Sequence, residues 1–73
     1  MARKILIIDD DRTNVKVVQN RLEKEGFFVI TAFDGDIGLQ KVKQSPPDLI
    51  ILDVEMPEMN GYSFIMELQK LSE

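Results

Sequence analysis

The chain contains no cysteine, no histidine and no tryptophan, and these absences exclude several kinds of site. Without cysteine it has no disulfide, no thiolate zinc site and no cysteine nucleophile. Without histidine it has no Ser–His or Cys–His catalytic pair and no imidazole that could relay a phosphoryl group. Long hydrophobic runs are absent too, because stretches such as Ile5–Ile8 and Leu49–Leu52 are far shorter than the roughly 20 residues that span a bilayer.

Positive charge is scarce, because the 73 residues carry 9 Lys and Arg against 13 Asp and Glu, a net charge of −4. This balance disfavours a nucleic-acid surface, which needs a basic patch, and suits the binding of cations. The N-terminus lacks the longer apolar segment of a signal peptide, so we expect a cytoplasmic protein that neither spans a membrane nor binds nucleic acid. The length fits one small domain, residues 1–73.

The spacing of apolar residues predicts three strands that alternate with three helices. Short runs rich in β-branched residues are typical of buried strands, whereas apolar residues three or four positions apart indicate one face of a helix. The predicted strands are Ile5–Ile8, Phe27–Ala32 and Leu49–Leu52. The predicted helices run from Arg12 to a terminating Gly26, from Asp36 to Gln44 and from Tyr62 to Leu71, with a turn at Asp34-Gly35 and a loop over Val54–Asn60.

This alternation predicts an α/β fold with the element order β-α-β-α-β-α. Short connections imply parallel strands and right-handed crossovers, which place the strands in the order 2-1-3. The first and third strands then lie side by side, and their carboxyl ends are followed by Asp9-Asp10-Asp11 and by Asp53. Ligands bind at that edge in open parallel sheets, so we expect the functional site there.

Carboxylates gathered at one edge repel each other, and a divalent cation with oxygen ligands relieves that repulsion. Mg²⁺ fits, because it accepts one or two carboxylates and keeps several waters. Beside such an ion Asp53 could attack the phosphorus of a phosphate group, since the metal offsets the charge of both reactants. Helix capping is the simpler interpretation of the first cluster. It accounts well for Asp11 and poorly for Asp9 and Asp10, while Asp53 by itself is more typical of a turn.

Three segments carry a recognisable pattern. They are Ile5-Leu6-Ile7-Ile8-Asp9-Asp10-Asp11, Gly26–Gly35, and Leu49–Gly61 with Met-Pro and Asn-Gly in its loop. Together they resemble bacterial response-regulator receiver domains, in which they correspond to the first strand, the second strand with its turn, and the phosphoacceptor strand with its loop. The resemblance implies a partial flavodoxin-like fold and a phosphorelay function in a two-component system.

The resemblance also implies a role for each matching position. Asp53 is the expected acceptor of a phosphoryl group from a histidine kinase or a small phosphodonor. Asp9 and Asp10 are the expected acidic pair around Mg²⁺, with Asp10 the more direct ligand. Asp53 and the backbone carbonyl of Glu55 complete the expected protein ligands. The other implied residues shape the loop or cap the last helix, and they are Pro57, Gly61 and Asn60.

The resemblance covers only the first three of the five βα units of a receiver. The remaining units of that family carry a Ser or Thr and a Lys that engage the phosphoryl group, and no matching positions occur here. We therefore expect a truncated receiver whose phosphorylation is impaired.

The third strand is then an open edge with consecutive apolar residues, which is a template for pairing with another chain. We expect a homodimer that forms through the edge of Leu49–Leu52 or through the uncovered face of the sheet. An alternative hypothesis is a structural half-fold fragment that dimerises without signalling activity.

A second alternative comes from Asp9-Asp10-Asp11-Arg12-Thr13, which fits the pattern Asp-x-Asp-x-Thr and resembles the first motif of haloacid-dehalogenase-type phosphatases. Asp9 would then be the nucleophile and Asp11 the acid/base. The pattern leaves the loop after Asp53 unexplained, so we favour a signalling module over an enzyme that turns over phosphate esters.

Overall fold

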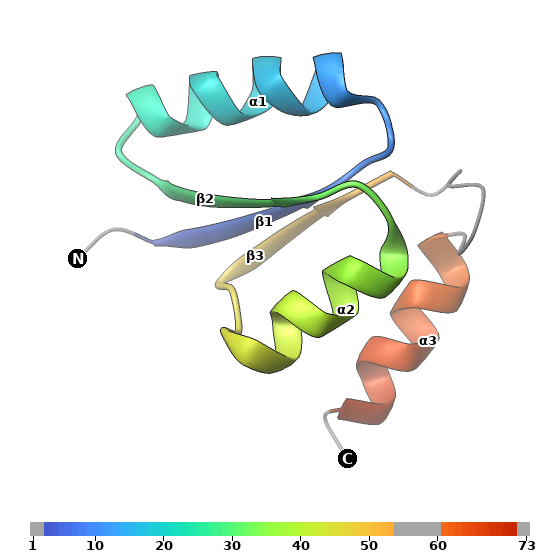
Figure 1. Ribbon diagram of the computed structural model, residues 1–73. Coiled ribbons are helices and arrows are strands. Elements are labelled where there is room, and N and C mark those ends of the chain that lie inside the picture. The colour runs from blue at the N-terminus through green and yellow to red at the C-terminus, as the bar shows by residue number, and fades with distance from the viewer. Residues whose placement is uncertain (1–2, 54–60, 72–73) are drawn as a thin grey trace.

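The fold has three layers, with a parallel sheet between helices on both of its faces (Figure 1). The computed structural model describes residues 3–53 and 61–71, with side chains placed at 3–53 and 65–70. The strands are β1 (Lys4–Ile8), β2 (Phe28–Ala32) and β3 (Leu49–Leu52), and the helices are α1 (Arg12–Lys24), α2 (Gly35–Gln44) and α3 (Gly61–Leu71). Helix α1 lies on one face of the sheet, and α2 and α3 lie on the other.

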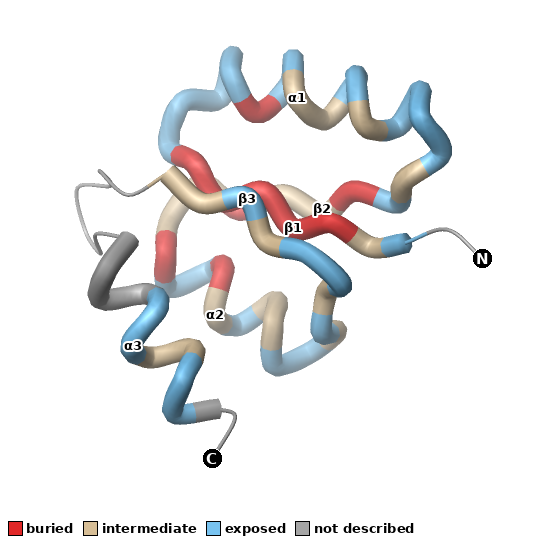
Figure 2. Tube along the Cα trace, turned by 180° about the vertical axis from the view of Figure 1, so that it is seen from behind, coloured by how far each residue is buried: buried red, intermediate tan, exposed pale blue. Residues whose placement is uncertain are grey.

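Strand β1 occupies the centre of the sheet, whose order is β2-β1-β3, and both of its pairings are parallel. Ile8 lies opposite Ala32 of β2 and opposite Leu52 of β3, so the three strands end at the same level. The element order, the parallel pairing and the strand order predicted from the sequence are confirmed. Because β1 has a strand on each side and helices on both faces, its four apolar side chains are deeply buried (Figure 2).

Alternate residues of β1 face opposite layers, as the pleat of a strand requires. Ile5 and Ile7 pack beneath α1, where they meet Val15. Leu6 and Ile8 face the other layer, where the partly buried side chains that complete the core are Ile30, Leu39, Val42, Ile50, Leu52 and Leu68. Burial on both faces explains why the strand is an uninterrupted apolar run.

The ends of the helices follow local capping residues. Asp34 is the N-cap of α2, and its carboxylate accepts a hydrogen bond from the backbone N–H of Ile37 at 2.8 Å. The sequence predicts a turn at Asp34-Gly35 and a helix from Asp36, but the helix starts one residue earlier because this capping bond orders the turn as a helix start. Gly26 follows α1 with a φ of +94°, which confirms the predicted stop, since glycine adopts this conformation without strain.

Helix α3 begins at Gly61 and packs mainly on α2. The spacing of the apolar residues of this helix predicts one inward side, formed by Phe64, Ile65, Leu68 and Leu71. Leu68 contacts the core as predicted, whereas Ile65 is exposed. The predicted loop Val54–Asn60 and the side chain of Phe64 lie outside the described residues. Over the described parts of the chain, no helix combines the length and the apolar character needed to cross a membrane.

Strand β3 is only partly covered on the α1 face. Leu49 is 55% exposed and Ile51 is 37% exposed, because α1 lies mainly over β1 and β2. The two side chains line a groove of about 330 Å³, and its other lining residues are Arg3, Ile5, Leu22, Phe27 and Asp48. This edge of the sheet therefore presents apolar side chains to solvent.

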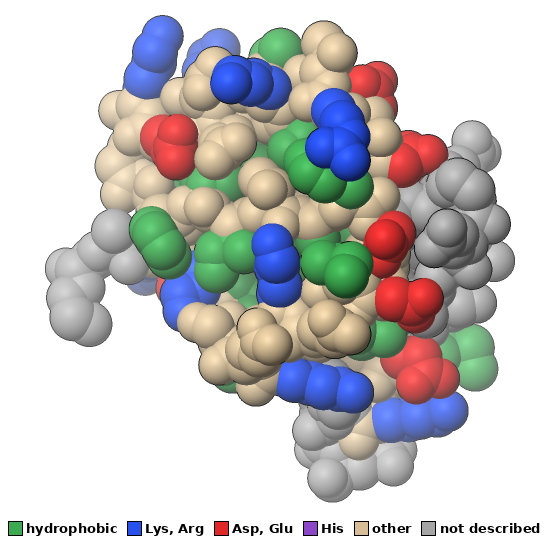
Figure 3. Space-filling model, viewed as in Figure 1, with side chains coloured by type: hydrophobic (Ala, Val, Ile, Leu, Met, Phe, Trp, Pro, Cys, Tyr) green, Lys and Arg blue, Asp and Glu red, His purple; other side chains and the backbone are tan. Residues whose placement is uncertain are grey.

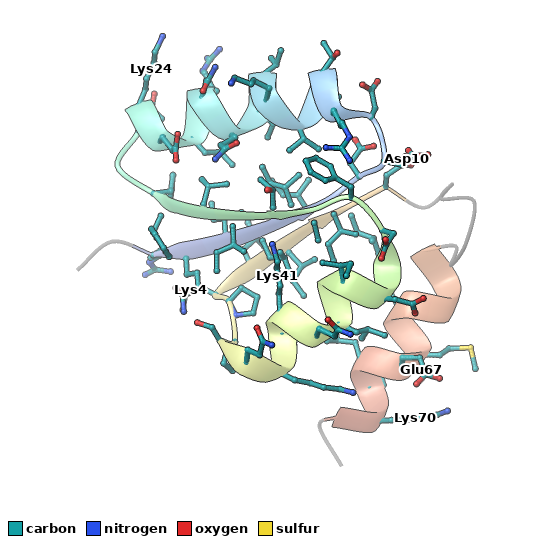
Figure 4. The ribbon with its side chains drawn as sticks, viewed as in Figure 1. Lys4, Asp10, Lys24, Lys41, Glu67 and Lys70 are labelled. Atoms are coloured by element: carbon teal, nitrogen blue, oxygen red, sulfur yellow. The ribbon has the colours of Figure 1, made fainter. Side chains whose placement is uncertain are left out.

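The opposite edge of the sheet, on β2, is protected by a lysine. Lys41 extends from α2 toward the sheet (Figure 4), and its Nζ donates a hydrogen bond to the backbone carbonyl of Thr31. Thr31 lies between residues whose backbone groups pair with β1, so its own carbonyl points away from β1 toward the outer edge. A lysine at such an edge discourages the addition of another strand. The sheet is thus open on the β3 side and partly protected on the β2 side.

Shortening a core side chain tests this packing. Ile7→Val removes one methylene from a side chain that is 1% exposed, so the free energy of unfolding should fall by about 1 kcal/mol. The same change at Ile37, which is 39% exposed on α2, is the control and should cost less than about 0.5 kcal/mol. Urea denaturation followed by circular dichroism measures both values. Equal losses at the two positions would contradict the burial of β1.

Candidate functional site

Three aspartates meet at the edge of the sheet where β1 and β3 end. Asp9 and Asp10 directly follow β1, and Asp53 follows β3. The backbone N–H of Asp53 donates to the carbonyl of Ile8 at 2.9 Å, and that of Asp9 donates to the carbonyl of Ala32 at 3.1 Å. Each aspartate offers one carboxylate oxygen, and these three oxygens all lie within 4.8 Å of one another. The strand order predicts that four aspartates gather at this edge, and the structure brings together three of them, without Asp11.

The surroundings of this cluster are acidic as well. Figure 3 shows Asp and Glu side chains gathered along the right-hand edge of the molecule, and Figure 4 places Asp10 on that side, at the opposite end of α1 from Lys24. Helix α1 directs its N-terminus, the positive end of its dipole, at this edge and carries Arg21 and Lys24 in its last turn. The helix dipole offsets part of the negative charge of the cluster.

Asp9 is the most enclosed member of the cluster, with 8% of its surface exposed. Its Oδ1 accepts a hydrogen bond from the backbone N–H of Asp11 at 2.9 Å, and its Oδ2 accepts one from Nδ2 of Asn14 at 2.7 Å. Burial alone would raise the pKa of the Asp9 carboxyl, but these two hydrogen bonds help to hold that pKa below its ordinary value. Asp9 is therefore a carboxylate at neutral pH.

Asp11 caps α1 and does not belong to the three-carboxylate cluster. Its Oδ1 accepts hydrogen bonds from the backbone N–H groups of Thr13 at 3.1 Å and Asn14 at 3.2 Å. This confirms the capping interpretation of Asp11, and a carboxylate occupied in this way is poorly placed for the acid/base role that the phosphatase hypothesis requires. The guanidinium of Arg12 lies over the ring of Phe33, 4.1 Å from its centroid.

The sequence does not predict any role for Asn14, which the structure places against Asp9. The position of Asn14 gives one indication of such a role. Asn14 is a short polar residue three positions after the capping Asp11, so it lies in the first turn of the helix, close to the residues that precede α1. Such a residue can donate back across the helix start. The sequence does not give the direction of this side chain, however, so it does not distinguish Asn14 from the other exposed polar residues of α1.

The donor set of the cluster fits Mg²⁺. Asp9, Asp10 and Asp53 offer carboxylate oxygens, the ligands that Mg²⁺ prefers, and Asp10 is exposed, so waters can complete the coordination. The other predicted members of the site fall mostly beyond the part of the chain that the structure describes. Three of them lie outside the described residues and stay predictions, namely the backbone carbonyl of Glu55, the loop residue Pro57 and the capping residue Asn60. Gly61 is the first residue of α3.

Comparison with protein families gives one clear match. The sequence model of one family, the response regulator receiver domain, matches residues 5–73. The chain is 41% identical over 70 residues to the alkaline phosphatase synthesis transcriptional regulatory protein PhoP of Bacillus subtilis, which covers 96% of this chain and 29% of that protein. It is 43% identical over 77 residues to the chemotaxis protein CheV3 of Helicobacter pylori, which covers 92% of this chain and 25% of that protein. The chain thus spans less than a third of the length of these curated relatives.

Solved structures share the fold. The chemotaxis response regulator CheY4 of Vibrio cholerae superposes with a TM-score of 0.95 at 35% identity, covering 99% of this chain and 60% of that chain. The response regulator TrrA of Thermotoga maritima, solved in complex with Mg²⁺-BeF, has a TM-score of 0.89 at 33% identity, covering 94% of this chain and 60% of that chain. These similarities confirm the predicted partial flavodoxin-like architecture.

Removing one carboxylate should stabilise the protein in the absence of metal. Like charges a few ångströms apart repel by on the order of 1 kcal/mol in water, so Asp10→Asn should raise the free energy of unfolding in EDTA by about that amount. Glu23→Gln removes the same charge from the exposed, far end of α1 and should have less than half that effect. Urea denaturation in EDTA measures both variants.

Adding Mg²⁺ completes this test. A cation that binds only the folded state raises the free energy of unfolding, so Mg²⁺ should stabilise the unsubstituted protein and Glu23→Gln. Mg²⁺ should stabilise Asp10→Asn much less. If Asp10→Asn proved less stable than the unsubstituted protein in EDTA, mutual repulsion would not be the dominant interaction in the cluster.

Proposed function

The chain belongs to the response regulator receiver domain family, and we propose on that basis that Asp53 accepts a phosphoryl group in a reaction that needs Mg²⁺. In this proposal Asp9, Asp10 and Asp53 bind the ion, and the backbone carbonyl of Glu55 is a further ligand. The chain then acts as a signalling module of a two-component system, modified on one residue, rather than as an enzyme that turns over substrate.

One observation carries the proposal, namely the meeting of three carboxylates at the end of β1 and β3. A turn or a helix cap needs one aspartate, and Asp11 already fills the capping role for α1. Two further carboxylates within 4.8 Å of Asp53 cost stability through repulsion, and groups held at such a cost are typical of functional sites. The arrangement suits a site that binds a cation next to a reactive carboxylate.

In the proposed step one carboxylate oxygen of Asp53 attacks the phosphorus of the donor. A new P–O bond to Asp53 forms, the bond between phosphorus and the donor breaks, and the donor leaves with that electron pair. When bound, Mg²⁺ offsets the negative charge of the carboxylates and of the phosphoryl oxygens, which otherwise keeps two anions apart. Asp9 and Asp10 supply the charge that holds the cation beside Asp53.

The donor class that this family implies is a histidine kinase, and a small phosphodonor is its experimental substitute. The chain spans 29% of PhoP and 25% of CheV3, so transcriptional or chemotactic output is not carried over to it. We propose a cytoplasmic location, where such kinases present their phosphohistidine. We also propose that phosphorylation of the 73 residues is inefficient, because they offer no counterpart of the Ser or Thr and the Lys that engage the phosphoryl group in the family.

Incubation with acetyl phosphate and Mg²⁺ tests the phosphoacceptor. Intact-mass spectrometry should show a fraction of the chain heavier by one phosphoryl group, and EDTA should abolish that species because the carboxylates then repel the donor. Asp53→Asn should remove the modification, since it replaces the attacking carboxylate with an amide.

Asp48→Asn is the matched control, because Asp48 precedes β3 as Asp53 follows it. This variant should be modified as fully as the unsubstituted chain. The proposal fails if prolonged incubation with a large excess of donor gives no mass increase, or if Asp53→Asn is still modified to the same extent.

We also propose that a second copy of the chain covers the exposed side of β3. Leu49 and Ile51 present apolar surface there, while Lys41 discourages the addition of a strand at the opposite edge of the sheet. Full antiparallel pairing of two β3 strands would set Asp48 of each copy opposite Asp53 of the other, and like charges directly opposite destabilise a sheet. Contact between the two grooves on the α1 face avoids that repulsion, so we favour it over pairing of the edges.

Light scattering during size-exclusion chromatography measures this association. The unsubstituted chain should elute with twice the chain mass, and Leu49→Lys should elute as a monomer because it places a charge in the apolar contact. Val17→Lys, at an exposed apolar residue on α1, is the control and should remain dimeric. A monomeric unsubstituted chain at high protein concentration would rule out the dimer without affecting the phosphoacceptor proposal.

A further inference from the structure

Asn14 joins the start of α1 to the acidic cluster. Its side-chain Nδ2 donates a hydrogen bond to Oδ2 of Asp9 at 2.7 Å. Its backbone N–H donates to Oδ1 of Asp11 at 3.2 Å, which is one of the capping bonds of the helix. The residue as a whole is exposed, yet its amide is directed at a partly buried carboxylate. One residue thus connects the helix cap with the proposed metal ligands.

The side-chain bond of Asn14 serves the acidic edge rather than the helix. A helix start needs acceptors for its free backbone N–H groups, and Asp11 already accepts from those of Thr13 and Asn14. An amide that donates to a carboxylate satisfies none of these groups. Its contribution is to hold one oxygen of Asp9 in place.

Asp9 needs such a restraint because two like charges lie beside it. Repulsion from Asp10 and Asp53, whose oxygens lie within 4.8 Å, favours rotation of the Asp9 carboxylate away from the cluster. The backbone N–H of Asp11 restrains Oδ1 and the amide of Asn14 restrains Oδ2. Each oxygen keeps a second lone pair that can accept a metal-bound water or a metal ion.

We propose that Asn14 is a positioning residue of the magnesium site, since its amide keeps the Asp9 carboxylate beside Asp10 and Asp53. The inference rests on the proposed binding of Mg²⁺ at this edge. A carboxylate that is already oriented loses less conformational freedom when the cation binds, so the affinity is higher. Groups that orient metal ligands in this way typically change the affinity for the metal about 10- to 100-fold.

Isothermal titration calorimetry with MgCl₂ on the full chain tests this role. Asn14→Leu keeps the approximate size of the side chain but removes the donor, and its Kd for Mg²⁺ should rise about tenfold. Asn14→Gln retains a hydrogen-bond donor on a side chain one methylene longer, so it should recover part of the affinity for Mg²⁺ that Asn14→Leu loses. Asn20→Leu, about 9 Å further along α1 given the helical rise, is the matched control and should bind as the unsubstituted chain does.

The outcomes separate this inference from the proposed function. If the unsubstituted chain binds no Mg²⁺, the proposed function and the positioning role fail together. If it binds Mg²⁺ and Asn14→Leu binds equally well, the positioning role alone is overturned. Equal weakening in Asn14→Leu and Asn20→Leu would also overturn it, since the loss would then reflect a general effect on α1.

A measurement on the unsubstituted chain avoids any dependence on how the variants fold. In ¹H–¹⁵N spectra the side-chain amide signal of Asn14 should shift as MgCl₂ is added, because its acceptor Asp9 changes its environment, while the signal of Asn20 should stay unchanged. Saturable binding of Mg²⁺ with no movement of the Asn14 signal would overturn the role.

Discussion

The register between β1 and β3 is the constraint on which the site depends. Because Ile8 and Leu52 lie opposite each other, the acidic residues that follow both strands are forced to the same edge. Burial of the apolar side chains of β1 on both faces stabilises the sheet enough to hold like charges together. The free energy that packs the core thus keeps the carboxylates close, so the ligands of the proposed cation are assembled before it binds.

Much of this fold can be predicted from the sequence because its signals are local. The apolar runs specify buried strands, the spacing of Val15, Val18 and Leu22 specifies a helix, and chain connectivity fixes the strand order. The misses have a different origin. The start of α2 depends on how the Asp34 side chain turns toward a backbone N–H, and the exposure of Ile65 depends on α3 packing mainly on α2 rather than on the sheet. The spacing of apolar residues along the sequence predicts neither the start of α2 nor the exposure of Ile65.

The same distinction applies to the site. That Asp9, Asp10 and Asp53 meet follows from the order of the strands, since the topology alone carries them to one edge. The part played by Asn14 does not follow, because it depends on the direction of one amide across the start of a helix. Lys41 is a similar case, as nothing in its spacing shows that it reaches a carbonyl of β2. Sequence patterns locate backbone positions, whereas the contacts of these two residues depend on the direction of their side chains.

The carboxylates at the start of α1 give one end of the molecule a negative charge that the dipole of the helix offsets only in part. Arg21 and Lys24 lie beside Glu23 at the end of the helix, so that end carries less negative charge than the beginning, where the aspartates gather. A negatively charged donor that approaches the acidic extremity is opposed by its field over roughly a Debye length, about 8 Å at physiological ionic strength. For the proposed reaction this field favours an order in which the cation arrives before the anionic donor, and this order needs no moving part of the protein.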